Sequence, residues 1–122
     1  RLPVRTANEL STVVAKLAQW ESRGGERSTL LVAGASDANV ELTRVNDGYA
    51  KALGVWPWQR IEVDGLGTAA ARAQLLAGVD GGAALVSFVG HSSTDRWDFQ
   101  PLLSVADVAV LRNAGRPALF LQ

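Results

Sequence analysis

The stretch that decides the fold is AALVSFV (83–89), followed directly by GHSS (90–93). A short, nearly continuous apolar run that ends in glycine and polar residues is typical of a strand buried on both faces of a parallel sheet. The pattern therefore predicts a central strand over 84–90. It also places His91, the single histidine of the chain, at the carboxyl end of that strand.

Three further segments have the length and composition of strands. Residues 29–34 are a short apolar run of the buried type, and residues 117–121 are the fourth strand. Residues 60–63 alternate polar and apolar side chains, which favours a position nearer the edge of a sheet.

The segments between these strands show helical spacing of their apolar residues. Thr6-Ala7-Asn8-Glu9 has the pattern of a capping box that begins a helix, and Gly24-Gly25 ends it. Three further helices are expected: one from a loop at 34–37 to Leu53, one from Thr68 to about Ala77, and one from a cap at 104–107 to Asn113.

Strands that alternate with helices of this length pair in parallel through right-handed crossovers. We therefore expect one domain over residues 1–122, a three-layer α/β sandwich with a parallel four-stranded sheet of order 2-1-3-4. The ligand crevice of such a sheet lies at the carboxyl ends of the strands, where the winding reverses between strands 1 and 3. The loops at 34–37 and 90–93 both fall there.

Two residues of these loops are candidates for chemistry. His91 is placed for general acid–base work, because histidine exchanges protons near neutral pH. The alternative is a surface or capping histidine without function. Asp37 is a candidate for orienting His91 or for binding a cationic group, and the alternative is a helix cap beside Ser36.

Other candidates carry weaker signals. Ser92 and Ser93 suggest a serine nucleophile, but the chain has no Gly-x-Ser-x-Gly elbow. Gly65-Leu66-Gly67 is only part of a dinucleotide fingerprint. Trp97 is a candidate pocket wall in the loop after His91, and WPW (56–58) is a break that either forms a binding patch or closes the sheet.

Composition excludes several functions. The 122 residues carry 12 basic and 12 acidic side chains, so the basic surface of a nucleic-acid binder is missing. No apolar run approaches the roughly 20 residues of a membrane span. There is no cysteine, which excludes disulfides and Cys-based zinc sites, and a lone histidine argues against a metal centre. Arg1 is not preceded by a leader, so we expect any targeting signal outside this segment.

Two blocks of residues resemble a known family. RLPVRT (1–6), with Glu9 and Lys16, resembles the opening of the gingipain-like cysteine peptidase domain. LVSFVGHSS (85–93), with the residues that follow it in the same order and spacing, resembles the catalytic-histidine block of that family. Those residues are Trp97, Asp107, Val108, Leu111, Arg112, Asn113 and Pro117.

The resemblance implies a caspase-like fold in which His91 is the base and acid, and the N–H groups around Gly90 and Ser92 hold the oxyanion. It also implies a nucleophilic cysteine after the fourth strand, beyond Gln122, so that this chain alone should be inactive. Two positions differ from the family pattern: Ser92 replaces a glycine, and Gly34 replaces an acidic residue, for which Asp37 is the nearest substitute.

By the same resemblance the substrate would be a peptide or protein, no cofactor would be needed, and the parent protein would be extracellular or on the cell surface. Two alternatives remain: a non-catalytic copy of the fold used for binding or for secretion and sorting, and a flavodoxin-like binding domain. We also expect Gln122 to lie beside His91, and an exposed fourth strand that favours a homo-oligomer.

Overall fold

The structure is a computed structural model that describes residues 4–22 and 28–122. Its main sheet has four strands in the order β2-β1-β3-β6, and all neighbouring pairs are parallel. This confirms the predicted order, since β6 is the fourth strand of this sheet. The strand bounds are Thr29–Ala33 (β1), Trp58–Glu62 (β2), Leu85–Val89 (β3) and Leu119–Leu121 (β6).

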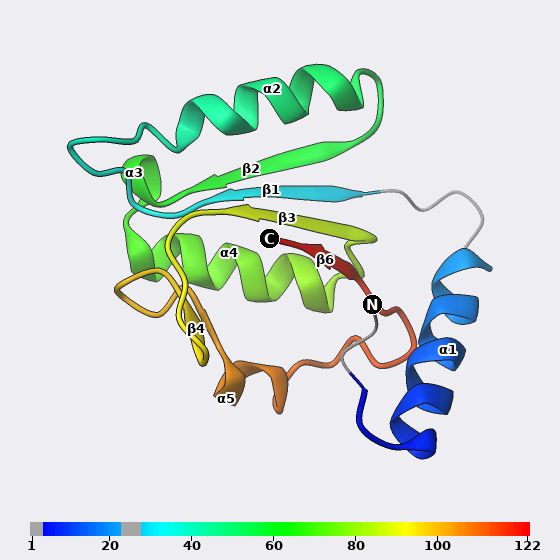
Figure 1. The fold of residues 1–122 in the computed structure, drawn as a ribbon. Coiled ribbons are helices and arrows are strands. Elements are labelled where there is room, and N and C mark those ends of the chain that lie inside the picture. Colours follow the sequence, from blue (N-terminus) through cyan, green and yellow to red (C-terminus); the bar gives the residue numbers. More distant parts are fainter. Residues whose placement is uncertain (1–3, 23–27) are drawn as a thin grey trace.

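Helices cover both faces of the sheet, as Figure 1 shows. The helix α2 (Thr43–Leu53) lies on one face, while α4 (Thr68–Asp80) and α5 (Val105–Val108) lie on the other. The short helix α3 (Val63–Leu66) follows β2. The described segments therefore form the expected α/β sandwich, and none of their helices is long and apolar enough to cross a membrane.

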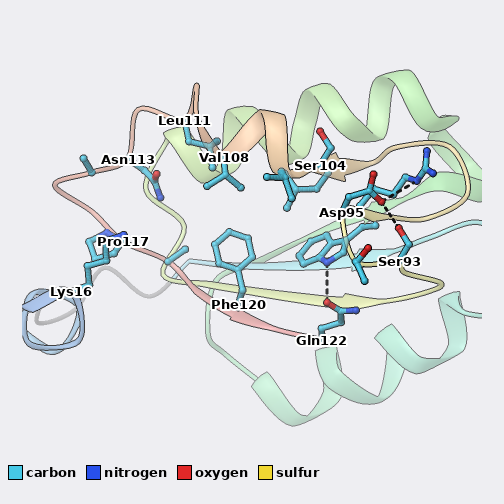
Figure 2. A pocket seen from close by; sticks show the side chains of 17 residues that line it. Lys16, Ser93, Asp95, Ser104, Val108, Leu111, Asn113, Pro117, Phe120 and Gln122 are labelled. Atoms are coloured by element: carbon cyan, nitrogen blue, oxygen red, sulfur yellow. Dashed lines mark hydrogen bonds and ion pairs between the residues drawn. The ribbon is translucent and has the colours of Figure 1, made fainter. Parts of the chain in front are cut away.

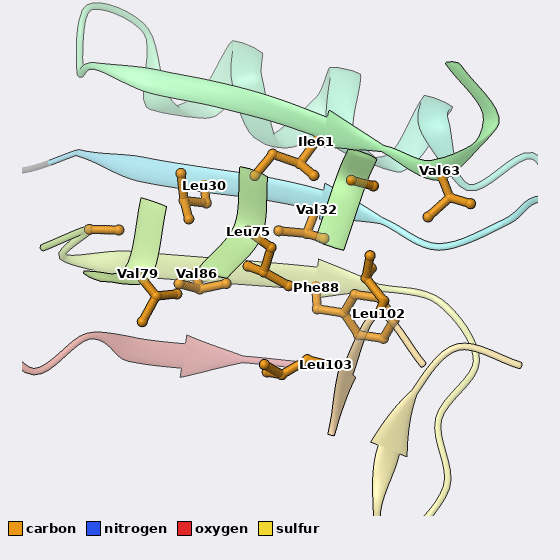
Figure 3. Packing of buried hydrophobic residues seen from close by; sticks show 12 residues of the cluster. Leu30, Val32, Ile61, Val63, Leu75, Val79, Val86, Phe88, Leu102 and Leu103 are labelled. Carbon is orange, nitrogen blue, oxygen red and sulfur yellow. The ribbon is translucent and has the colours of Figure 1, made fainter. Parts of the chain in front are cut away.

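The hydrophobic core lies between the sheet and α4 (Figure 3). All five residues of β1 are buried, as a central parallel strand requires. Leu75 of α4 is fully buried against the strand residues Val32 and Val86 of the same cluster. This packing holds α4 against β1 and β3, the strands that the loops with Asp37 and His91 follow.

The second helix begins later than predicted. We expected a cap at Ser36 or Asp37, but α2 begins at Thr43 and its N-cap has no side-chain hydrogen bond. Asp37 Oδ1 instead accepts the N–H groups of Asn39 at 2.7 Å and Val40 at 3.0 Å. An aspartate that satisfies nearby backbone donors offers the chain a turn in place of a helix.

Other boundaries also differ from the prediction. The strand β2 begins at Trp58 rather than residue 60, and α4 continues past Ala77 through Gly78 to Asp80. A Cβ at Gly78 would lie 2.8 Å from Leu30, so glycine here lets the helix approach β1. The segment containing Gly65 forms α3 and not a phosphate loop.

The segment between β3 and β6 is more ordered than the predicted loop. It contains a small antiparallel pair, β4 (Arg96–Trp97) and β5 (Leu103–Ser104). The capping box at the start of α5 is present, but the helix ends at Val108 and not at Asn113. The added strands come from pairing across the loop, which sequence periodicity over two residues cannot reveal.

The amino-terminal helix α1 (Ala7–Glu21) begins with the predicted capping box. Its apolar face, however, is not buried: Leu10, Val14 and Leu17 are 42%, 52% and 40% exposed. Figure 1 shows α1 to one side of the sheet, at the end where β1 and β3 begin. The predicted stop at Gly24-Gly25 and the opening Arg1-Leu2-Pro3 lie outside the described residues.

Candidate active site

His91 is the second residue after β3, following Gly90, and lies at the carboxyl end of the sheet. The parallel register of β1 and β3 places Ala33 opposite Val89, so the loops that follow the two strands are neighbours. His91 Nε2 lies 3.1 Å from Asp37 Oδ2, and the two side chains are 41% and 38% exposed. The structure therefore brings together two residues that sequence reasoning placed on the same rim.

The surroundings of this pair favour a charged carboxylate. The pKa of Asp37 is held below its usual range by the N–H groups of Asn39 and Val40, and then by the hydrogen bond with His91. The ring of Phe99 lies against the imidazole, with centroids 4.6 Å apart. A hydrogen bond from Nε2–H to Asp37 leaves Nδ1 of His91 as the nitrogen that can accept another proton.

Gly90 has a structural reason to be glycine. A Cβ there would lie 2.6 Å from the ring of Phe88 and 3.3 Å from the Cα of Gly34. A side chain at Gly90 would therefore collide with Phe88 and crowd the backbone that follows β1. Within the described part of the chain, no hydrogen bond is formed by the N–H of Gly90 or Ser92.

The serines next to His91 make other contacts. Ser92 Oγ accepts a hydrogen bond from Gln122 Nε2, and Ser93 Oγ donates to Asp95 Oδ1 at 2.6 Å. Neither hydroxyl bonds to His91, so the geometry of an activated serine is not formed among the described residues. The contact with Ser92 places Gln122, as expected, at the same end of the sheet as His91.

Trp97 connects the loop after His91 to the end of β6. Its ring stacks on Phe88 with centroids 4.3 Å apart and planes 3° apart, and its Nε1–H donates to Gln122 Oε1 at 3.0 Å. The ring of Phe120 is tilted against the indole of Trp97, with centroids 5.8 Å apart. The half-buried indole is thus fixed in position by stacking and by one hydrogen bond.

An open groove of about 590 Å³ lies beside this cluster, between the β4–β5 pair, α5 and β6. Figure 2 shows Val108 and Leu111 on one side of the groove and Phe120 on the other, with Ser93 and Gln122 at the end away from Lys16 and Asn113. Ser93 is two residues from His91 in the chain. Trp97 lines the groove, but His91 does not. The groove therefore adjoins the histidine without enclosing it.

Sequence reasoning missed one buried acidic residue at this site. Asp98 is 4% exposed and its backbone N–H donates to the carbonyl of His91 at 2.7 Å. Its carboxylate accepts the N–H of Ala35 at 2.8 Å. No sequence motif marks this residue, because its role depends on a loop some 60 residues away in the chain.

The described residues contain no cluster of three side chains suited to a metal ion. The arrangement is that of an α/β protein with a carboxylate-bound histidine at a topological switch point, the usual place for ligands in this architecture. Such a histidine can take and return a proton, provided that a nucleophile reaches its free nitrogen.

A comparison with known protein families shows the family of this chain. The model of peptidase family C25 matches residues 1–122, the whole chain. The chain therefore belongs to peptidase family C25, the gingipain family of cysteine peptidases. No curated protein and no solved structure matches it.

Proposed function

We propose that this chain is the histidine-bearing part of a cysteine endopeptidase, with His91 as the group that transfers protons. The observation that carries the proposal is the hydrogen bond between His91 and Asp37, formed by loops that follow two neighbouring strands. Membership of a peptidase family supports the reaction class, since a cysteine peptidase needs a histidine to activate its thiol.

In the proposed reaction, Asp37 orients the imidazole and stabilises its protonated form. The Nδ1 atom of His91 takes the proton from a cysteine thiol, and the thiolate attacks the carbonyl carbon of a peptide bond. The histidine then gives the proton to the leaving amine, and water later hydrolyses the acyl-enzyme. The N–H groups of Gly90 and Ser92 would donate to the oxygen that becomes negative.

The nucleophile must come from outside these residues, because the sequence contains no cysteine. The contact between Gln122 and Ser92 supports a nucleophile near the end of β6, since it brings that strand beside the histidine loop. Trp97 would form a wall of the substrate pocket, and the groove next to it would take apolar parts of a protein substrate. By family likeness, the parent protein would act outside the cell or at its surface.

The side chain at position 92 favours a second candidate function. A non-catalytic copy of the peptidase fold could bind proteins or take part in their secretion and sorting. Ser92 is consistent with such a role, because its side chain is engaged by Gln122 beside the proposed oxyanion site. The flavodoxin-like alternative lacks support, since the segment around Gly65 forms a helix.

The residues that follow Gln122 in the parent gene distinguish the two functions. A cysteine within about ten residues supports the peptidase, and its absence supports the binding module. A chain extended through that cysteine should cleave peptides, and His91→Ala should lower its kcat/KM by a factor of about 10²–10⁴. The 122-residue chain should cleave none. Hydrolysis by the 122-residue chain that is lost in His91→Ala would overturn the cysteine mechanism and favour Ser92 or Ser93.

A further inference from the structure

Asp98 occupies an unusual place in the fold. It is buried, with 4% of its surface exposed, and its φ of 66° is the only positive φ of a non-glycine residue in the segments that the structure describes. Aspartate tolerates this left-handed conformation better than most residues, but it is still adopted only where the surroundings require it. The contacts of Asp98 show what requires it.

Three hydrogen bonds join Asp98 to both loops of the site. Its N–H donates to the carbonyl of His91 at 2.7 Å, and its Oδ2 accepts the N–H of Ala35 at 2.8 Å. Its Oδ1 accepts the N–H of Phe99 at 2.7 Å, and the Phe99 ring contacts the imidazole of His91. One buried carboxylate therefore holds the loop before Asp37 and the residue that covers the histidine ring.

The loop after β1 is shaped to receive this carboxylate. A Cβ built on Gly34 would lie 3.0 Å from Asp98 Oδ2 and 3.2 Å from its Cγ, so any side chain there would push the carboxylate away. Gly34 lies directly after Ala33 of β1 and its N–H donates to Val89 of β3. The Asp98 carboxylate thus occupies the space beside Gly34, at the carboxyl ends of β1 and β3.

We propose that Asp98 is the positioning residue of this site: it fixes the imidazole of His91 against Asp37 by tying together the loops that carry them. It acts through these two residues and touches no reacting atom. This inference rests on the proposed function, because the alignment has a catalytic meaning only if His91 transfers protons. The contacts themselves can be tested without peptidase activity.

His91 is the only histidine, so its imidazole signals in nitrogen-15 NMR are unambiguous. In the unsubstituted chain the Nε2–H tautomer should exceed its fraction in the urea-unfolded chain, because Asp37 accepts that proton. Nuclear Overhauser contacts should join the rings of His91 and Phe99. Both signals report the position of the His91 ring. If Asp98 only stabilised the fold, its substitution would not alter these signals.

The main variant is Asp98→Asn. Asparagine tolerates the left-handed conformation and keeps the size of the side chain. Its amide has a single oxygen, so it cannot accept the N–H groups of both Ala35 and Phe99 with separate oxygens. We expect the tautomer fraction to shift toward the unfolded value and the contacts between His91 and Phe99 to be lost. Near-ultraviolet circular dichroism should show that the fold is kept.

Two further variants complete the test. Gly34→Ala leaves Asp98 in place but moves its carboxylate, so it should shift the His91 signals in the same direction. If Asp98→Asn does not fold, Gly34→Ala alone tests the positioning role of Asp98.

Asp95→Asn is the matched control. It changes an exposed aspartate of the same loop, which contacts Ser93 and Arg96, and it should leave the His91 signals unchanged.

The two proposals can fail separately. Folded Asp98→Asn and Gly34→Ala chains with unaltered His91 signals would overturn the positioning role and leave the proposed function intact. An unsubstituted chain whose His91 already has the tautomer fraction of the unfolded chain would contradict the pairing with Asp37, and with it both proposals. A shift in Asp98→Asn that Asp95→Asn reproduces would also overturn the specific role of Asp98.

Discussion

At the scale of single residues, the site depends on small side chains as much as on reactive ones. Gly34 and Gly90 lie back to back, and a Cβ on Gly90 would meet the ring of Phe88. The loops that carry Asp37 and His91 follow these two glycines, and the two side chains are within hydrogen-bond distance. The carboxylate of Asp37 then receives bonds both from its own turn and from the histidine.

The pKa of Asp37 should lie below the ordinary value of about 3.9 for aspartate. The largest contributions come from the N–H groups of Asn39 and Val40, so His91→Ala should raise the Asp37 pKa only part of the way back. A lowered pKa stabilises the fold at pH above the unfolded value, and this contribution is lost as the pH falls through the folded pKa. Carbon-13 NMR of the Asp37 carboxyl group measures both values. A full return to the unfolded value in His91→Ala would contradict the order of contributions.

At the scale of elements, a part-buried ion pair connects two segments on the same face of the sheet. Asp107 of α5 receives the guanidinium of Arg72 from α4, with one N···O distance of 2.7 Å, and it also closes the capping box of Ser104. Its side chain is only 7% exposed. The pair holds α5 and the β4–β5 pair against α4, and thereby one wall of the groove.

Asp107→Asn should lower the free energy of unfolding by about 1–3 kcal/mol, because it leaves the Arg72 charge without its partner. The pKa of Asp107 is lowered to about 2, chiefly by Arg72. Its stabilisation is therefore present above about pH 4 and lost as the pH falls toward 2. This contribution is at most about 2 kcal/mol, and less because the Arg72 side chain is 34% exposed.

Urea unfolding measures this difference, and Asp47→Asn is the matched control. Asp47 also binds an arginine, Arg60, but its side chain is 64% exposed. Its loss should cost only about 0–1 kcal/mol. Equal losses for the two variants would show that burial does not strengthen the Arg72–Asp107 pair.

The packing of α4 on the sheet gives a second prediction at this scale. Leu75 is fully buried in the core cluster (Figure 3), so Leu75→Ala should destabilise the chain by about 2–5 kcal/mol. Val55 is 99% exposed, and Val55→Ala should change stability by less than about 0.5 kcal/mol. Urea unfolding of both variants provides the comparison. A loss below 1 kcal/mol for Leu75→Ala would mean that α4 is not docked as described.

At the scale of the whole molecule, the two edges of the sheet differ. The edge strand β2 carries Gln59, Arg60 and Glu62, and such polar side chains discourage pairing with another chain. All three residues of β6, Leu119, Phe120 and Leu121, are exposed, at 38%, 39% and 50%. Among the described residues no strand pairs with the outer side of β6.

We expect the 122-residue chain to self-associate through β6. Sedimentation velocity over a range of concentrations should detect a dimer, and Phe120→Lys should raise its dissociation constant about tenfold or more, since lysine protects sheet edges. The control is Gln59→Lys on β2, which should leave the dimer unchanged. A monomer at every concentration, or the same effect from both variants, would rule out association through this edge.

The sequence by itself determined the four strands of the main sheet and their order. The apolar run at 29–33 is a fully buried strand, the run at 85–89 is a strand buried at alternate positions, and the helical segments between the strands impose parallel pairing. From that order alone, the loop of Asp37 and the loop of His91 had to share one rim. The capping boxes at Thr6 and Ser104 were also readable, since each depends on residues three positions apart.

Only the tertiary structure decided how that rim is built. Residues after Asp37 could form either a turn or the first turn of α2. The turn forms because the Asp37 carboxylate binds nearby backbone N–H groups and His91. Asp98 joins Ala35 to His91 across more than 60 residues, and α1 has a clear apolar face that is nevertheless exposed. Local patterns fix local structure, whereas these contacts arise between segments far apart in the chain and are therefore settled only when the whole chain packs.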